Sequence, residues 1–270
     1  MNQVAAEVTK NNRVLENIFR THRRKLTSSH IIWLRCPEIA RESRPGQFVM
    51  VSCGEECRLP RPFSIHQIID RGGMALFFGV WQDGRGTHWL SQRQASDKID
   101  LLGPLGNGFS THSASHNLLL VAGGIGIAPL YSLAQDALSK GCTVTLLSGA
   151  STASQLYPSH LLPPEIKLIT ATEDGTGGEK GLITDLLPDY VHWADQIFAC
   201  GPMLMYRVMS TQHIVQDKPI QISLEVRMGC GLGVCYGCTV KTKSGLKQVC
   251  KDGPVFELDD ILWDELASEY

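Results

Sequence analysis

Three cysteines and four glycines stand within ten residues, in the stretch GCGLGVCYGC from position 229 to 238. Four residues separate Cys230 from Cys235, two separate Cys235 from Cys238, and Cys250 follows after eleven more. This is the plant-type [2Fe–2S] spacing, whereas structural zinc sites usually pair their thiols as two C-x2-C knuckles. Glycine permits tight turns and lets backbone N–H groups approach sulfur. The spacing favours an iron–sulfur cluster over zinc, and unligated core cysteines are the third interpretation.

The other cysteines are scattered on or beside predicted strands, where a cysteine is usually a small buried hydrophobe. They are Cys36, Cys53, Cys57, Cys142 and Cys200. The early stretch VTKNNRVLENIFRTHRRKL is broken by charges and predicts no export signal, so we expect a cytoplasmic protein and no disulfide framework. Among these five thiols, only Cys200 is a functional candidate, because it ends a predicted strand and is followed by a turn through Gly201 and Pro202.

The composition is that of a globular protein with several domains. The chain has 270 residues, 43% hydrophobic and 19% charged, with a net charge of −2. Because there is no broad basic field, we expect no nucleic-acid partner. Residues 117–135 carry no charge over nearly the length of a membrane helix, but three glycines and Pro129 interrupt them. We therefore predict a strand, a turn and a buried helix there, and no membrane partner.

The pattern of apolar runs divides the chain into three regions and predicts an α+β multidomain fold. Residues 1–112 alternate short β-like runs with turns, which indicates an antiparallel β-barrel. In residues 113–218, four apolar runs are each followed by a turn and a candidate helix, which favours a parallel α/β sheet. Residues 219–270 contain the cysteine loop, a hairpin turning at Ser244 and Gly245, and an acidic tail.

Two turns in the central region predict a nucleotide site. The stretch LLLVAGGIGIAPL places Gly123, Gly124 and Gly126 between a strand and a helix, although without the G-x-G-x-x-G spacing. A second strand ends at Cys200 and turns through Gly201 and Pro202. Ligands bind at the carboxyl ends of such strands. No Lys or Arg occurs from position 148 to 165, which favours NAD(H) over NADP(H).

The barrel region holds two candidate flavin elements. Arg61 offers a guanidinium fork for a diphosphate and Ser64 a hydroxyl for a ring edge, although Arg61 could also be an ordinary surface residue. Downstream, GRGTHWLS places Gly86 before a helix that we expect Thr87 to cap. Together, the two stretches favour a flavin more than either does alone.

The motifs together resemble the electron-transfer subunit of class B dihydroorotate dehydrogenase, within the ferredoxin-reductase-like flavoproteins. They include RPFSI, GRGTHWLS, GPLGNGF, GGIGIAPL, CGP and SLEVRMGCGLGVCYGC, and cover nearly the whole chain. The resemblance implies FAD in the barrel, NAD(H) in the central region and a [2Fe–2S] cluster. It assigns the cluster to Cys230, Cys235, Cys238 and Cys250, and FAD to Arg61, Pro62, Phe63, Ser64, Gly86 and Thr87. Phe77, Phe78 and Gly79 should align with a further flavin-contacting strand, although Gly79 stands where a basic residue is common.

The resemblance also implies a partner subunit and a direction of electron flow. An FMN-containing catalytic subunit would oxidise dihydroorotate, and electrons would pass through the cluster and FAD to NAD+, in a heterotetramer of two plus two chains serving pyrimidine biosynthesis. Met228 and Val234 are candidate docking residues, unless they only pack around the cluster. Two alternatives remain: a reductase subunit of a hydrogenase-type or sulfur-reducing complex, and a non-redox docking module stabilised by zinc.

Overall fold

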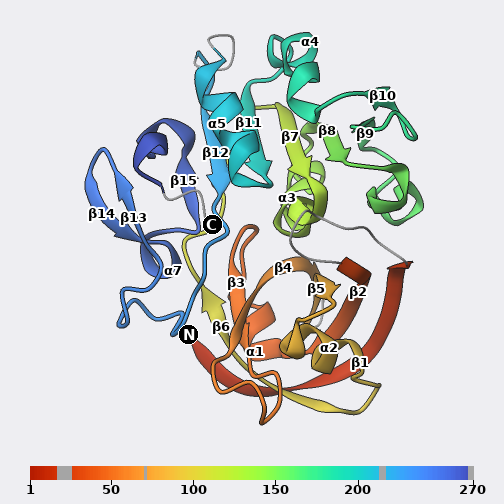
Figure 1. Ribbon diagram of the computed structural model, residues 1–270, viewed down its shortest axis with the longest axis vertical. Coiled ribbons are helices and arrows are strands. Elements are labelled where there is room, and N and C mark those ends of the chain that lie inside the picture. Colours follow the sequence, from red (N-terminus) through yellow and green to blue (C-terminus); the bar gives the residue numbers. More distant parts are fainter. Residues whose placement is uncertain (17–25, 70–71, 213–216, 267–270) are drawn as a thin grey trace.

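The structure is a computed structural model that describes residues 1–16, 26–69, 72–212 and 217–266. A barrel forms one half of the molecule and an open sheet the other, and the C-terminal segment lies beside both (Figure 1). The predicted α+β architecture is confirmed.

Six antiparallel strands close the barrel in the order β1-β2-β5-β4-β3-β6, with β6 pairing back onto β1. The strands are β1 (Asn2–Glu16), β2 (Leu26–Arg35), β3 (Phe48–Val51), β4 (Arg61–Ile69), β5 (Gly73–Trp81) and β6 (Lys98–Leu105). Two short helices accompany them, α1 (Pro37–Ala40) and α2 (Arg85–Ser91). The interior is aliphatic and aromatic, with Ile32, Ile65 and Leu76 fully buried. The predicted antiparallel barrel is confirmed, and its first strand already begins at Asn2.

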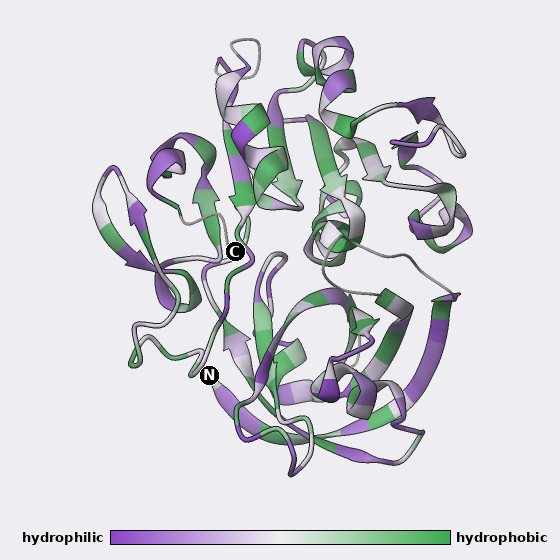
Figure 2. Cartoon of the chain, viewed as in Figure 1, coloured by the Kyte–Doolittle hydropathy of each residue, from purple (hydrophilic) through white to green (hydrophobic). Residues whose placement is uncertain are grey.

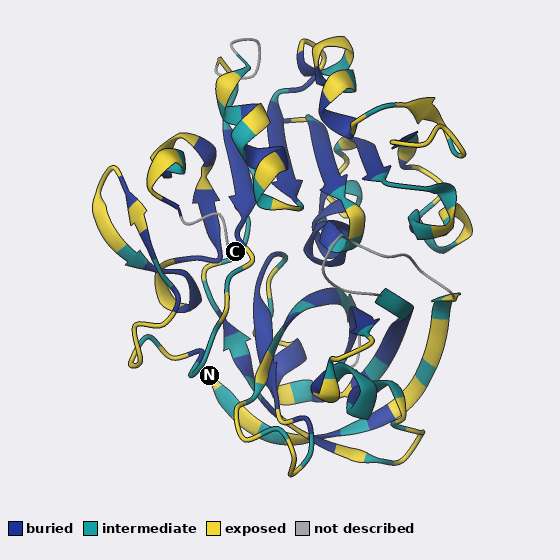
Figure 3. Ribbon diagram, viewed as in Figure 1, coloured by how far each residue is buried: buried dark blue, intermediate teal, exposed yellow. Residues whose placement is uncertain are grey.

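The open sheet has seven strands in the order β10-β9-β8-β7-β11-β12-β15. They are β7 (Asn117–Gly123), β8 (Thr143–Ala150), β9 (Lys167–Thr172), β10 (Glu179–Lys180), β11 (Gln196–Cys200), β12 (Ile220–Ser223) and β15 (Val255–Glu257). All neighbouring pairs are parallel except β12 with β15. The central strands β7 and β11 are mostly apolar and buried, as parallel strands covered on both faces must be (Figures 2 and 3). The predicted parallel sheet is confirmed.

The helices of this half are fewer than the sequence pattern predicts. α3 (Ile127–Ser139) follows β7, and α5 (Met203–Thr211) follows β11. The prediction of a helix after each strand is wrong for β8, which is followed only by 3-10 turns at Ala153–Gln155 and Ser159–Leu161. Pro158, Pro163 and Pro164 lie in this connection, and proline there opposes a continuous helix. After β9 come β10, a 3-10 turn at Ile183–Leu186 and the short helix α4 (Leu187–Val191).

The uncharged stretch 117–135 divides into β7 and α3, as predicted. Within the described ranges, no helix is long and apolar enough to cross a membrane. α3 packs between the sheet and strand β4 of the barrel, so that its apolar residues join the two halves into one core (Figure 1).

The C-terminal segment forms a hairpin of β13 (Thr239–Thr242) and β14 (Gly245–Gln248), then α7 (Val249–Asp252). Gly245 has φ +106, which confirms the predicted turn at Ser244 and Gly245. Beyond it, 3-10 turns occupy Leu258–Asp260 and Trp263–Glu265. β12 and β15 fall in the predicted third region but belong to the seven-stranded sheet. Because the third predicted region shares this sheet with the second, the limits of the three predicted domains remain a prediction.

Candidate functional site

The two turns predicted to bind a nucleotide lie against each other at the carboxyl ends of β7 and β11. A Cβ atom added to Gly123 would be 2.6 Å from the Pro202 ring, and one added to Gly126 would be 1.9 Å from the Cys200 carbonyl oxygen. Gly124 differs, because it has φ +55 and open space on its Cβ side. The turns therefore pack backbone to backbone and leave an open side where a diphosphate would fit.

Cys200 is fully buried, with its Sγ atom 4.0 Å from Oε1 of Glu225. Burial, followed by the Glu225 charge, raises the pKa of the Cys200 thiol well above its usual value, so the sulfur stays protonated. Tyr206 of α5 accepts a hydrogen bond from the Gly201 N–H at 2.9 Å and donates one to the Ser223 carbonyl at 2.7 Å. The turn after β11 is thus tied to β12.

Sequence reasoning did not select Glu225 or Tyr206 as site residues. Glu225 follows the end of β12, next to the strand that carries Cys200. Its signal was its place in the stretch SLEVRMG, which leads into the cysteine loop. Tyr206 carried no signal, because a tyrosine within an apolar helix usually belongs to the core.

On the barrel, the structure brings Arg61 and Gly86 together. A Cβ atom added to Gly86 would be 3.2 Å from Cβ of Cys53 and 3.4 Å from Cγ of Arg61. The Arg61 side chain is exposed, and its Nη1 donates to the Leu59 carbonyl at 3.1 Å. The stem of an exposed arginine therefore crosses the first turn of α2 where any side chain larger than hydrogen would crowd it.

Thr87 does not cap its helix as predicted. α2 begins at Arg85 with Gly84 at the N-cap position, and Thr87 lies within the first turn. Its hydroxyl donates to the Gly84 carbonyl at 3.0 Å and accepts from the Trp81 N–H at 3.4 Å. Because the N-cap position falls at Gly84, three residues before Thr87, the Thr87 hydroxyl holds β5 to the start of α2 instead.

The remaining predicted flavin residues follow the inward and outward alternation of their strands. Phe63 packs edge-on against Phe78 inside the barrel, with ring centroids 5.6 Å apart, whereas Ser64 is only half-buried. Phe77 faces out of the barrel toward the sheet domain. A Cβ atom on Gly79 would lie 2.6 Å from Cδ1 of Leu26, so a basic side chain there would have to displace the end of the Leu26 side chain. Flavin contact at Phe77, Phe78 and Gly79 stays a prediction.

The four candidate cluster ligands form two pairs, Cys230 with Cys235 and Cys238 with Cys250. The Sγ atom of Cys230 accepts from the Leu232 N–H at 3.3 Å, and Sγ of Cys250 accepts from the Gly233 N–H at 3.1 Å. Desolvation opposes ionisation of Cys230, but the N–H donors of Leu232 and Cys235 outweigh it and lower the pKa of this thiol to about 6. Backbone N–H groups thus reach the sulfurs of Cys230, Cys238 and Cys250, while burial, followed by the neighbouring Cys238, raises the pKa of the Cys250 thiol to about 12.

The donor set fits a two-iron cluster better than a single zinc ion. Each iron of a [2Fe–2S] cluster takes two thiolates, whereas zinc gathers its ligands on one tetrahedral centre. The pairing of Cys230 with Cys235 and of Cys238 with Cys250 matches the first requirement.

The cysteine loop lies directly on the barrel. Gly231 has φ +71, and a Cβ atom there would be 2.5 Å from Cγ of Met50 in β3. Met50 is paired in turn with Pro62 of β4. The cysteine loop is therefore separated from the predicted flavin strand by the single strand β3.

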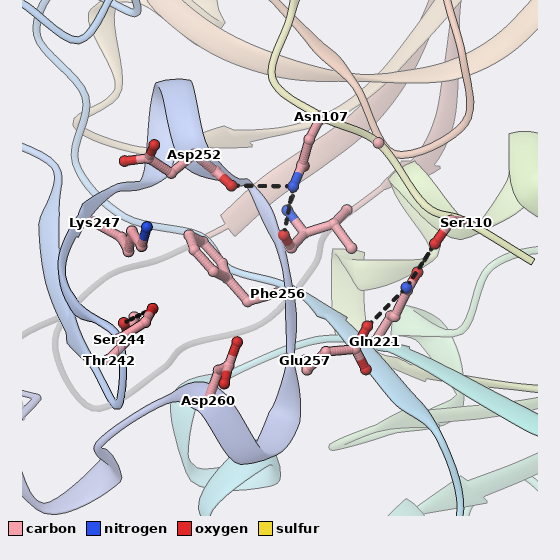
Figure 4. A pocket seen from close by; sticks show the side chains of 12 residues that line it. Asn107, Ser110, Gln221, Thr242, Ser244, Lys247, Asp252, Phe256, Glu257 and Asp260 are labelled. Carbon is pink, nitrogen blue, oxygen red and sulfur yellow. Dashed lines mark hydrogen bonds between the residues drawn. The ribbon is translucent and has the colours of Figure 1, made fainter.

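A cavity of about 530 Å³ lies elsewhere and is lined by none of the predicted site residues (Figure 4). It is a polar seam between residues 107–110 and the C-terminal segment. Asn107 donates to the carbonyls of Asp252 and Val255 across this seam, at 3.1 and 2.8 Å. Gln221 donates to Ser110 Oγ and to Glu257 Oε1, at 2.8 and 2.9 Å. These bonds attach the cysteine-bearing segment to the other two parts.

A closed antiparallel barrel beside a parallel nucleotide-binding sheet defines a ferredoxin-reductase-like flavoprotein. A solved structure of an NADH-dependent reduced ferredoxin-NADP oxidoreductase is similar over 97% of this chain and 91% of its own, with a TM-score of 0.83 and 29% identity. The ferredoxin reductase of carbazole 1,9a-dioxygenase shares the fold at a TM-score of 0.67 and 18% identity, over 82% of this chain and 68% of its own.

The comparisons also narrow the class to one family. Residues 225–262 match the family model described as the iron-sulfur cluster binding domain of dihydroorotate dehydrogenase B. The electron transfer subunit of dihydroorotate dehydrogenase B (NAD(+)) from Desulforamulus reducens is 39% identical, over 84% of this chain and 90% of its own length. The subunit of the same name from Geobacillus thermodenitrificans is 35% identical, over 83% and 89%. The chain therefore belongs to the family of dihydroorotate dehydrogenase B electron transfer subunits, as the sequence motifs predicted.

Proposed function

We propose that this chain transfers electrons between an FMN-containing catalytic subunit, which oxidises dihydroorotate, and NAD+, in pyrimidine biosynthesis. The observation that supports this most directly is the order of contacts in space. The cysteine loop rests on β3, β3 pairs with the Arg61–Ser64 part of β4, and α3 joins β4 to the glycine turn. A one-electron site, a flavin site and a dinucleotide site would therefore be consecutive neighbours.

The barrel residues fit a bound FAD. Arg61 would bind the diphosphate through its exposed guanidinium, together with the backbone of Gly86 and Thr87. Pro62, Phe63 and Ser64 would line the ring, with the half-buried Ser64 hydroxyl at its edge. When bound, FAD supplies the exchange of two electrons with nicotinamide and of single electrons with an iron–sulfur cluster.

The sheet residues fit a bound NAD(H). The diphosphate would lie over Gly123, Gly124 and Gly126, where the open side of Gly124 leaves room. Cys200, Gly201 and Pro202 would face the nicotinamide, with Cys200 as a neutral thiol beside Glu225. Farther along the sheet edge, Glu173 accepts from Ser151 Oγ at 2.7 Å after the end of β9. A carboxylate there favours a ribose hydroxyl over a 2′-phosphate, and so NAD(H) over NADP(H).

The cluster ligands would be the two thiol pairs, Cys230 with Cys235 and Cys238 with Cys250. Their N–H donors stabilise the thiolate charge that iron binding requires.

The catalytic partner would dock on the exposed side of this loop, within an assembly of two plus two chains. Val234 is 70% exposed and Tyr236 is 71% exposed, so the loop presents a large apolar side chain and an aromatic one beside the cluster. Met228 instead packs against the core. Val234 and Tyr236 are therefore better docking candidates than Met228.

The test is to co-express the chain with its catalytic partner and purify the complex anaerobically. We expect one FAD and two irons per copy of this chain, FMN in the partner, and dihydroorotate-dependent reduction of NAD+. A complex with flavin and iron but without dihydroorotate oxidation would refute the assigned substrate. A preparation without either cofactor would refute electron transfer itself.

One observation favours a second candidate, a reductase subunit of another complex. The similar structure titled for flavin-based electron bifurcation covers 97% of this chain at a TM-score of 0.83. Pull-down of the tagged chain from its source distinguishes the two. An FMN protein active on dihydroorotate supports the first function, and a different redox partner supports the second.

A further inference from the structure

A fully buried histidine joins the two halves of the molecule. His66 belongs to β4 of the barrel, has no exposed surface, and bonds through both ring nitrogens to the sheet domain. Its Nδ1 lies 3.0 Å from the carbonyl oxygen of Ala128 in α3, and its Nε2 lies 3.0 Å from the hydroxyl of Tyr157. A carbonyl only accepts, so Nδ1 donates to Ala128 and Nε2 accepts from Tyr157.

Aromatic rings close around this imidazole. The Tyr131 ring centroid lies 4.4 Å from that of His66, and the rings of Phe77 and Tyr157 lie at 5.4 and 5.5 Å. A second bond crosses the same interface, from Ser132 Oγ to the Ile65 carbonyl at 3.2 Å. Burial lowers the pKa of His66 to about 4, against the opposing effect of its bond to Ala128, so that the neutral ring persists at neutral pH.

The local backbone of β4 directs this side chain to the interface. The pairing of β4 with β5 is irregular between Ile65 and Gln67, with His66 at the irregularity. Ile65 points into the barrel core, whereas His66 packs outward, on the same side of the strand as Ser64 two residues earlier.

Both ends of the resulting link lie next to proposed cofactor residues. On the barrel side, Ser64 is two residues from His66. On the sheet side, Ala128 is two residues from Gly126, whose backbone packs against the Cys200 carbonyl. We propose that His66 is a positioning residue for hydride transfer, which holds the flavin strand and the nicotinamide turn at a fixed separation through Ala128 and Tyr157. This inference rests on the proposed function.

The experiment compares His66→Asn, His66→Leu and Tyr157→Phe with the wild-type chain in the assembled, cofactor-loaded complex. Asn keeps an amide that can donate to Ala128, Leu removes both bonds, and Tyr157→Phe removes only the hydroxyl. Stopped-flow absorbance measures the saturating rate of flavin reduction by NADH and the NADH concentration at half-saturation. FAD content and thermal midpoint are measured beside them, with His30→Gln as a control for loss of a buried histidine that bonds within the barrel.

We expect His66→Leu to lower the saturating rate by roughly tenfold to a hundredfold, as a misplacement near 1 Å does, with FAD content unchanged. Half-saturation should change far less, because no dinucleotide contact is removed. The saturating rates of His66→Asn and Tyr157→Phe should lie between those of His66→Leu and the wild type, and the rate of His30→Gln should equal the wild-type rate. A His66→Leu or Tyr157→Phe rate within twofold of wild type, or a loss that only follows lost FAD, would overturn the positioning role. A wild-type flavin that NADH does not reduce would instead refute the proposed function.

Discussion

Gly126→Ala tests whether the two turns at the sheet edge form the nicotinamide site. Gly126 has φ −60 and ψ −12, so alanine can adopt its backbone conformation. Space is the constraint, because the new Cβ atom would lie 1.9 Å from the Cys200 carbonyl oxygen. To reach even 3.0 Å, the two backbones must separate by 3.0 − 1.9 = 1.1 Å. Neither partner is a flexible side chain end, so the start of α3 must move away from β11.

A displacement of this size at the reacting centre is expected to cost about a hundredfold in rate. Overpacking of the core should also lower folding stability by roughly 1–3 kcal/mol. The assay is stopped-flow reduction of bound FAD by NADH, with FAD content measured separately because the barrel residues are untouched. The variant should keep its flavin and lose its rapid reduction.

Gly124→Ala is the matched control, because at Gly124 the backbone conformation disfavours alanine whereas the space for a Cβ atom is open. Gly124 has φ +55, which costs a non-glycine residue roughly 1–2 kcal/mol, but its Cβ position is open. The added methyl group points into the space proposed for the diphosphate, so it should weaken NADH binding while leaving the saturating rate nearly unchanged. The assignment of this edge to nicotinamide would be refuted by a Gly126→Ala protein that NADH reduces within threefold of the wild-type rate.

Three further changes test the other sites. Cys235→Ser should abolish iron content and dihydroorotate-dependent NAD+ reduction while sparing NADH-driven reduction of a dye at the flavin; loss of dye reduction with FAD still bound would contradict the order of carriers. Arg61→Ala should weaken FAD binding about tenfold or more by removing charge-assisted hydrogen bonds, measured as flavin retained after gel filtration, and full retention would exclude Arg61 from the site. Burial lowers the pKa of His66 from 6.5 to about 4, so the folded state binds fewer protons than the unfolded state between these values. The free energy of unfolding should therefore rise by roughly 3 kcal/mol as the pH rises from 4 to 6.5, and it should keep its full value above 6.5. The thermal midpoints at pH 4.5 and 7 should differ less in His66→Asn than in the wild type, and equal differences would contradict this prediction.

Local patterns were enough to predict the turns that carry the candidate site residues. The barrel strands, the glycine turn after β7 and the Cys200 turn each combine an apolar run with a breaker, and such signals are local in sequence. The cysteine spacing predicted a cluster for the same reason, because three of its four thiols lie within nine residues.

Contacts between distant segments could not be predicted in this way. Glu225 meets Cys200 because strand order brings β11 beside β12. His66 meets Tyr157 because the packing of the two halves brings the connection after β8 against β4. The prediction of a helix after β8 was wrong for another reason. It rested on an apolar run followed by polar residues, and it took no account of the prolines that interrupt the connection. The prediction that Thr87 caps α2 was wrong because Gly84, in the turn before the helix, occupies the N-cap position.

The strand β3 unites the proposed one-electron and flavin sites, and it explains why the cysteine loop must be bare. Gly231 needs glycine for two independent reasons: its φ of +71 disfavours a side chain, and a Cβ atom would lie 2.5 Å from Met50. A larger residue would lift the loop off β3, and with it the nearest thiol, Cys230. Because electron transfer weakens steeply with distance, the glycines do more than let the chain turn around a cluster. Gly231 in particular lets the backbone that carries the cysteines lie directly on the strand next to the proposed flavin site.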